Sequence, residues 1–290
     1  MEAVAIQLFD GTIRGLIYVA IALSLTIIFG MLRLVNFAHG AFYSVGAYVA
    51  WLVAPKIGYF GAIPAALIVL AIIALGLDRI VLRYFYAKDP TSQILLTFGI
   101  ALVIQETLRL IFGGTTQTTA IPAALTQTVP LGFISYPAIR LFVAVAIVVL
   151  VGVVWWILVG TNYGLIVRAG IRDRVMVALL GGNVTVASRV VLVVGAGIAG
   201  LVGALSSPIF GVDPNTGFTF LVPAFVVVVI GGLGSFWGAV IAGILIGILQ
   251  GLTTLVMPSA SDVVIYFAMA LILLVRPQGL MGESELIRQA

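Results

Sequence analysis

Residues 138–159 read AIRLFVAVAIVVLVGVVWWILV, and this run decides the class of fold. It contains one charged residue, Arg140, and apolar side chains do not alternate with polar ones along it. About 20 consecutive apolar residues in a helix span the hydrocarbon core of a bilayer. A strand of a membrane β-barrel would instead alternate with a period of two. The run therefore predicts a transmembrane helix and argues against a barrel.

Similar runs recur along the chain and predict an all-α, polytopic transmembrane bundle. Short or Gly/Pro-interrupted apolar segments of membrane proteins often break within the membrane and line a cavity. We therefore expect roughly eight to ten helical segments, some of them broken or re-entrant, in a single transmembrane domain over residues 1–290. The other long runs are 12–32, 60–77, 93–112, 190–210 and 234–256, and the short ones are 38–54, 218–231 and 262–275.

The composition supports a lipid-exposed protein and excludes several kinds of chemistry. Hydrophobic residues make up 62% of the chain and charged residues 8%, whereas a soluble domain has about 25% charged residues. There is no cysteine and a single histidine, His39. These counts exclude disulfides, thiolate sites and a multi-histidine metal site, so we expect no metal and no catalytic residue. No basic cluster with interleaved aromatic residues predicts a nucleic-acid partner.

The basic residues predict the orientation in the membrane, because cytoplasmic loops are enriched in Lys and Arg. Alternation of the spans places ten of the fourteen basic residues on one side, together with the C-terminus and the loop at 160–189. The uncharged segment 113–137 then lies outside. The N-terminus lies outside if 38–54 crosses completely and inside if it re-enters, and the sequence leaves both open. The ten residues are Arg33, Arg79, Arg83, Lys88, Arg168, Arg172, Arg174, Arg189, Arg276 and Arg288.

The longest polar stretch is the predicted cytoplasmic loop at 160–189. Val175, Ala178 and Leu179 have helical spacing, charged residues fall on the opposite face, and Gly181-Gly182 suits a helix C-terminus. This pattern predicts one short amphipathic helix, which would lie on lipid or dock into a groove of a partner. The alternative is a plain interfacial loop that obeys the positive-inside rule.

Three polar residues near or within the spans are candidates for a pathway or a gate. Asn36 and His39 are three residues apart, so they would share one face of a helix. They either hydrogen-bond a broken helix or brace a gate on the solute pathway. Ser206 either satisfies a kink in the span 190–210 or contacts the solute.

A cluster of glycines between two spans is a second candidate for the pathway. Glycine permits positive φ and close backbone approach, so the cluster predicts a helix break or a tight turn. Exposed backbone groups there would line the pathway, and the alternative is a connecting turn with close helix packing. The cluster comprises Gly231, Gly232 and Gly234, followed by Ser235.

Three ionisable residues lie at the predicted outer side. Glu106 and Arg109 are three residues apart near the end of 93–112, so we expect them to neutralise each other and reach toward the interface. Asp213 either caps the next segment or contacts an extracytoplasmic binding protein.

Three segments together resemble the branched-chain amino acid ABC permease family. They are Asn36-Phe37-Ala38-His39-Gly40 after the first long span, the loop with a Gly before an Arg-Ala pair, and Gly231-Gly232-Leu233-Gly234-Ser235. They occur in the expected order over nearly the whole chain, and the first resembles the shorter of the two permease subunits. At Gly182 this sequence differs from the family pattern, which has a β-branched apolar residue at that position. The loop positions that the resemblance marks as contacting an ATPase are Gly164, Arg168, Ala169, Asp173, Ala178, Gly181 and Asn183.

The resemblance implies a non-catalytic permease subunit in an importer of the bacterial or archaeal inner membrane. Its partners would be two cytoplasmic ATPase subunits, an extracytoplasmic solute-binding protein and a second permease subunit, either different or identical. The chain has no GxxxxGK[ST] motif, so ATP and Mg would bind to the partner ATPases and this chain needs no cofactor. The family carries branched-chain and other amino acids, urea, small amides and organic acids.

Two other classes of protein remain as alternatives. A stand-alone ion-coupled secondary transporter or channel would need membrane-buried carboxylates as coupling sites, and Glu106 is the one candidate within the spans. An intramembrane enzyme would need a nucleophile with a base, or a metal cluster. The single histidine and the scattered acidic residues argue against an enzyme.

Overall fold

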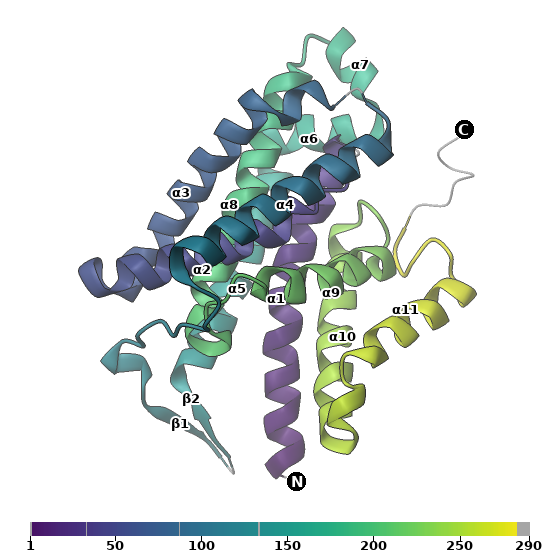
Figure 1. Ribbon diagram of the computed structural model, residues 1–290. Coiled ribbons are helices and arrows are strands. Elements are labelled where there is room, and N and C mark those ends of the chain that lie inside the picture. The colour runs from purple at the N-terminus through teal and green to yellow at the C-terminus, as the bar shows by residue number, and fades with distance from the viewer. Residues whose placement is uncertain (1, 33, 87, 133, 283–290) are drawn as a thin grey trace.

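The computed structural model describes residues 2–32, 34–86, 88–132 and 134–282 as a helical bundle with one small hairpin (Figure 1). Arg33 and Arg288, two of the basic residues used for the orientation, lie outside this part of the chain. The hairpin pairs β1 (Thr128–Leu131) with β2 (Ile134–Pro137) in antiparallel fashion. The α-helices are α1 (Glu2–Leu32), α2 (Ala38–Ile57), α3 (Tyr59–Ile80), α4 (Pro90–Phe112), α5 (Ala138–Gly160), α6 (Asn162–Arg172), α7 (Arg174–Leu179), α8 (Val184–Phe210), α9 (Thr216–Gly231), α10 (Phe236–Val256) and α11 (Val263–Val275).

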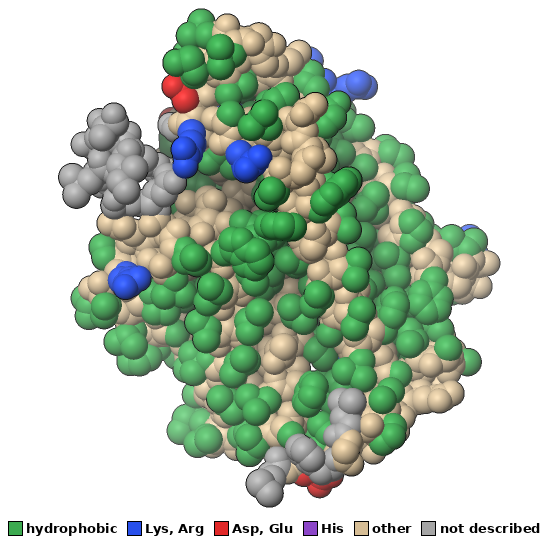
Figure 2. All heavy atoms as spheres, turned by 180° about the vertical axis from the view of Figure 1, so that it is seen from behind, with side chains coloured by type: hydrophobic (Ala, Val, Ile, Leu, Met, Phe, Trp, Pro, Cys, Tyr) green, Lys and Arg blue, Asp and Glu red, His purple; other side chains and the backbone are tan. Residues whose placement is uncertain are grey.

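Each of the nine predicted apolar runs contains a helix, which confirms the polytopic all-α fold. The loop at 160–189 adds two more, α6 and α7, so the described residues hold eleven α-helices. Six helices are long and apolar enough to cross a membrane: α1, α3, α4, α5, α8 and α10. Hydrophobic side chains cover the middle of the face in Figure 2, and most of the Lys and Arg side chains visible there lie toward the end that carries α6 and α7. The protein is therefore a multi-pass inner-membrane protein.

A close glycine contact joins the first half of α1 to α10. A Cβ atom placed on Gly247 would lie 2.3 Å from the Gly11 carbonyl oxygen and 2.4 Å from Gly15 Cα. One turn earlier on α10, a Cβ atom on Gly243 would lie 2.5 Å from Val19 Cγ2. Small residues let membrane helices approach until their backbones touch, and van der Waals contact then holds them together. These glycines therefore let α10 lie directly against α1, which is the most buried of the long helices.

The two ends of α1 lie at opposite faces of the bundle, which places the N-terminus. Near the first end, Asp10 accepts hydrogen bonds from Tyr136 on β2 and from Arg140 on α5. At the other end, Ile171 on α6 packs against Gly30. The N-terminus therefore lies on the face of the hairpin, opposite α6. If the basic loop 160–189 lies in the cytoplasm, as the positive-inside rule predicts, the N-terminus lies outside.

Two of the short helices begin inside the bundle rather than at its surface. His39, in the first turn of α2, contacts Ser24 on α1, about two turns before α1 ends. Ser44 on α2 accepts a hydrogen bond from the backbone N–H of Gly217 at the start of α9 (2.9 Å). A Cβ atom on Gly217 would lie 1.9 Å from the Gly40 carbonyl oxygen. The starts of α2 and α9 therefore meet within the bundle, as expected for broken segments of a transporter.

An ion pair ties α3 to α8 near the predicted cytoplasmic face. Arg189 Nε donates to Asp78 Oδ2 (2.7 Å), and the Tyr86 hydroxyl donates to Asp78 Oδ1. Asp78 is only 1% exposed, and Arg189 is 31% exposed. Burial, followed by the neighbouring Asp78 carboxylate, raises the pKa of Tyr86 above its ordinary value, so the phenol stays protonated and keeps donating.

We expect Asp78→Asn to destabilise the protein by about 2 kcal/mol, because the amide leaves the partly buried Arg189 without its anion. The value is below that for a fully buried pair, since solvent screens Arg189. The midpoint of thermal unfolding in detergent measures the effect. Glu106→Gln is the matched control, because it breaks the exposed pair with Arg109 and should change stability by less than about 0.5 kcal/mol. Equal shifts in the two variants would contradict the role given to Asp78.

Candidate functional site

Side-chain caps define the helices of the loop at 160–189. Thr161 Oγ accepts from Gly164 N at the start of α6 (3.1 Å), and Asp173 Oδ1 accepts from Val175 N and Met176 N at the start of α7 (2.9 Å each). A residue that caps the next helix cannot continue the previous one. The short helix predicted from Val175, Ala178 and Leu179 is present as α7, and Asp173 separates it from a second helix, α6, which the apolar spacing did not predict. Asn183 caps α8 in the same way, through Val186 N (3.0 Å).

The end of α7 is the Schellman turn that glycine favours. Gly181 has φ +84°, its N–H donates to Ala178 O (3.0 Å), and Gly182 N–H donates to Val177 O (2.9 Å). The predicted role of Gly181 at this C-terminus is confirmed. A Cβ atom on Gly182 would lie 2.6 Å from Val177 Cγ1, so this turn favours glycine where the family resemblance called for a β-branched residue.

Glycines also set how α6 packs against the membrane helices. A Cβ atom on Gly164 would lie 2.2 Å from the Leu158 carbonyl oxygen, so the chain could not fold back so closely after α5. A Cβ atom on Gly170 would lie 2.6 Å from Met31 Sδ on α1. Ala169, beside Gly170, is half-buried in this contact region. The helix α6 therefore packs directly against the end of α1.

The surface of α7 that faces away from the bundle is apolar and exposed. Leu179 and Leu180 are 76% and 80% exposed, Val175 and Met176 are also exposed, and Ala178 lies among them. Exposed apolar side chains that gather in one place mark a contact with lipid or with another protein. We call α6, α7 and Leu180 the coupling surface.

The glycine cluster lies beside this surface. Gly232 and Gly234 have φ of +99° and +88°, and Ser235 Oγ accepts from Gly238 N to cap α10 (3.1 Å). The chain at 280–281 pairs with the end of α9, since Met281 N donates to Gly231 O (3.1 Å). A tight turn is therefore confirmed here. The turn and α6 enclose a groove of about 640 Å³, which is lined by Arg168, Ile171, Arg172, Val229, Leu233, Gly234, Ser235, Pro277, Gln278, Met281 and Gly282.

Asn36, His39 and Ser206 lie deep in the bundle, away from the groove. Asn36 precedes α2 instead of sharing a helical face with His39, and its Oδ1 accepts from Ala38 N (3.1 Å). His39 Nε2 lies 2.6 Å from Ser24 Oγ, and Ser206 Oγ lies 2.5 Å from the Tyr43 hydroxyl. All three side chains are buried. They join α1, α2 and α8 where α2 begins, and their part in transport stays a prediction.

Two of the three outer ionisable residues pair with each other. Arg109 donates to Glu106 Oε1 (2.8 Å) and to Asn215 Oδ1 (3.2 Å), which confirms the expected neutral pair. Asp213 Oδ1 accepts from Asn215 N (2.8 Å) in the turn before α9. Asp213 thus shapes this turn.

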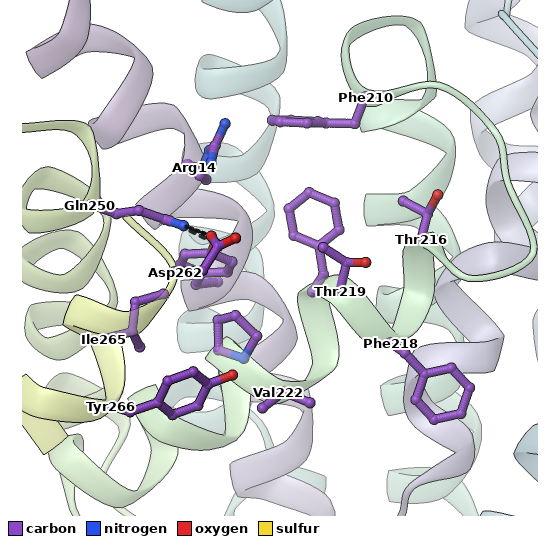
Figure 3. Close-up of a pocket in the computed structure, with 13 residues that line it drawn as sticks. Arg14, Phe210, Thr216, Phe218, Thr219, Val222, Gln250, Asp262, Ile265 and Tyr266 are labelled. Carbon is purple, nitrogen blue, oxygen red and sulfur yellow. Dashed lines mark hydrogen bonds between the residues drawn. The ribbon is translucent and has the colours of Figure 1, made fainter. Parts of the chain in front are cut away.

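A polar pocket between α1, α9, α10 and α11 was missed by the sequence predictions (Figure 3). The Tyr18 hydroxyl donates to Gln250 Oε1 (2.8 Å), and Gln250 Nε2 donates to Asp262 Oδ1 (2.9 Å). Arg14 also lines this pocket, and its guanidinium carbon lies 5.7 Å from the centre of the Phe210 ring. The sequence contained one sign of this pocket: Arg14 is an ionisable residue within the apolar run 12–32, and such residues often mark functional sites.

Comparisons with known proteins agree with this architecture. The family model described as the branched-chain amino acid transport system permease component matches residues 7–274. The chain is 29% identical to the high-affinity branched-chain amino acid transport system permease protein BraD of Pseudomonas aeruginosa, with 96% of each chain covered. It is 26% identical to the corresponding protein LivH of Escherichia coli, again over 96% of each chain.

A third relative is archaeal. The probable branched-chain amino acid transport permease protein LivH of Methanocaldococcus jannaschii is 27% identical, over 91% of this chain and 88% of the relative. The family model and the relatives cover nearly the whole chain, from the first span to the last. The chain therefore belongs to the branched-chain amino acid transport system permease family.

Proposed function

We propose that this chain is a membrane-spanning subunit of an ATP-driven importer that carries branched-chain or other small amino acids into the cytoplasm. The observation that carries the proposal is the coupling surface. It combines the exposed apolar residues of α7 with a glycine-mediated contact between α6 and α1. A partner that pulls on α6 would move a helix that runs through the whole bundle.

The partners follow from this role. Two cytoplasmic ATPase subunits bind ATP and Mg and dock on the coupling surfaces. A second permease subunit, of different or identical sequence, completes the pore, and a binding protein delivers the amino acid from outside. No covalent step is assigned to this chain. The names of the relatives, which are branched-chain amino acid permeases, support the amino acid as cargo.

The ion-coupled alternative has less support. Such a transporter uses membrane-buried carboxylates that bind and release an ion. Three carboxylates among the described residues of the long helices are held by arginines: Asp10 by Arg140, Asp78 by Arg189 and Glu106 by Arg109. Asp262, which makes no ion pair among the described residues, is exposed in the loop before α11 and is not a membrane-buried carboxylate. A carboxylate fixed in an ion pair is a poor site for reversible ion binding.

Gentle affinity purification of the chain from its own cells, with mass spectrometry of the proteins that accompany it, tests the assembly. We expect one or two P-loop ATPases and a second permease subunit. Recovery of the chain alone, with gradient-driven uptake in vesicles that lack ATP, would contradict the proposal.

A further inference from the structure

The pocket between α1, α9, α10 and α11 has a volume of about 580 Å³, which is within the range of small-molecule sites. It lies toward the outer face, because Arg14 is one turn from Asp10, which contacts the hairpin. Figure 3 shows Arg14 and Asp262 on one side of the pocket, with Phe210, Thr216, Thr219 and Val222 toward the other. The pocket therefore offers charged groups on one side and a mixed wall of aromatic, apolar and threonine side chains on the other.

The acidic side of the pocket, the exposed Asp262, is held in place by hydrogen bonds that start from two buried residues. Tyr18 and Gln250 are 3% and 2% exposed. Tyr18 fixes the Gln250 amide, whose Nε2 then holds one oxygen of Asp262. In the part of the chain that the structure covers, Asp262 makes no ion pair. Its carboxylate therefore keeps free acceptor positions at the pocket.

The basic side is unpaired as well. Across the described ranges Arg14 makes no ion pair, and the acid one turn away, Asp10, already accepts from Tyr136 and Arg140. The two opposite charges, Arg14 and Asp262, face one pocket without neutralising each other. Arg14 is half-buried within α1, and Asp262 is exposed in the loop before α11, so both charges are accessible to a ligand in the pocket. An ionisable residue within a span, such as Arg14, is a candidate functional group.

We propose that this pocket binds the charged head group of an α-amino acid, with Arg14 on the carboxylate and Asp262 on the ammonium. A guanidinium presents a planar fork of donors that fits a carboxylate, and a carboxylate accepts from the ammonium group. The side chain of the amino acid lies against Phe210, Phe220 and Ile265. This assignment rests on the proposed function and names where its cargo is recognised on the way in.

A photoreactive diazirine analogue of leucine tests the assignment in the complete assembly, reconstituted in proteoliposomes with its binding protein and ATP. We expect irradiation to label residues that line this pocket, with excess leucine preventing the label. Arg14→Gln and Asp262→Asn should each lower labelling and maximal uptake at least tenfold. The assembly and its ATP hydrolysis should persist, and Arg14→Lys should retain part of the uptake.

Arg109→Gln and Glu106→Gln are the matched controls, since they remove the same charges from the exposed pair outside the pocket. Both should keep normal labelling and uptake. Label that appears elsewhere, or unchanged uptake in both pocket variants while the unmodified assembly takes up leucine, would overturn the pocket assignment alone. Absence of ATP-driven leucine uptake by the unmodified assembly would overturn the proposed function and the pocket assignment with it.

Discussion

Gly247→Val is expected to prevent the normal packing of α1 against α10 and to cost about 3 kcal/mol, at the upper end for an overpacked site. The first added carbon would lie 2.3 Å from the Gly11 carbonyl oxygen and 2.4 Å from Gly15 Cα. Both are backbone atoms, so no side chain can rotate away and the helices must separate. Because α1 also contacts α5, α8 and α9, the separation would disturb the whole bundle.

The amount of monodisperse protein after detergent extraction, with its thermal unfolding midpoint, measures this loss. Gly152→Val on α5 is the matched control, because a Cβ atom there meets no atom within 4 Å. The control should resemble the unmodified protein. If Gly247→Val is as stable as the control, the glycine contact is not what holds the bundle together.

Arg168→Glu is expected to lower ATP-driven uptake at least tenfold. Arg168 is exposed on α6 and lines the cytoplasmic groove together with Arg172 and the turn at Gly234-Ser235. A partner that docks into this basic groove presents acidic or neutral groups, so reversal of the charge would repel it. The change leaves the caps of α6 and α7 in place, since these depend on Thr161 and Asp173.

Uptake and ATPase recovery in the same preparation separate the possible outcomes. Loss of the ATPase from the complex, or hydrolysis without uptake, would support the coupling surface. Arg83→Glu is the control, because Arg83 is an exposed basic residue between α3 and α4, outside the groove. Normal uptake and normal assembly in Arg168→Glu would remove the coupling role from α6.

The helices could be predicted well because the length and apolar composition of each run identify it without reference to the rest of the chain. A run such as 138–159 is apolar on every side, so its length alone indicates a membrane helix. The sequence did not determine on which side of the membrane the N-terminus lies, because this depends on how Asp10 and Gly30 contact distant parts of the chain. Such contacts between residues far apart in the sequence leave no local pattern.

The candidate site was predicted only in part, because some of its features depend on local sequence and others on contacts between distant residues. The glycine turn at 231–235 and the C-terminus of α7 follow from local backbone preferences. The boundary between α6 and α7 could not be predicted, because the charge pattern does not show whether Asp173 is solvated or caps a helix. The polar pocket joins Tyr18, Gln250 and Asp262, which are separated by more than two hundred residues from first to last. Its members look ordinary until the fold brings them together.

The central claim is that this permease works with a separate ATPase. Leucine uptake by proteoliposomes that contain the purified assembly and its binding protein tests it directly. We expect uptake that requires ATP on the side of α6 and α7 and that continues when ionophores collapse the ion gradients. Uptake without ATP that stops when the gradients collapse would contradict the account and favour an ion-coupled transporter.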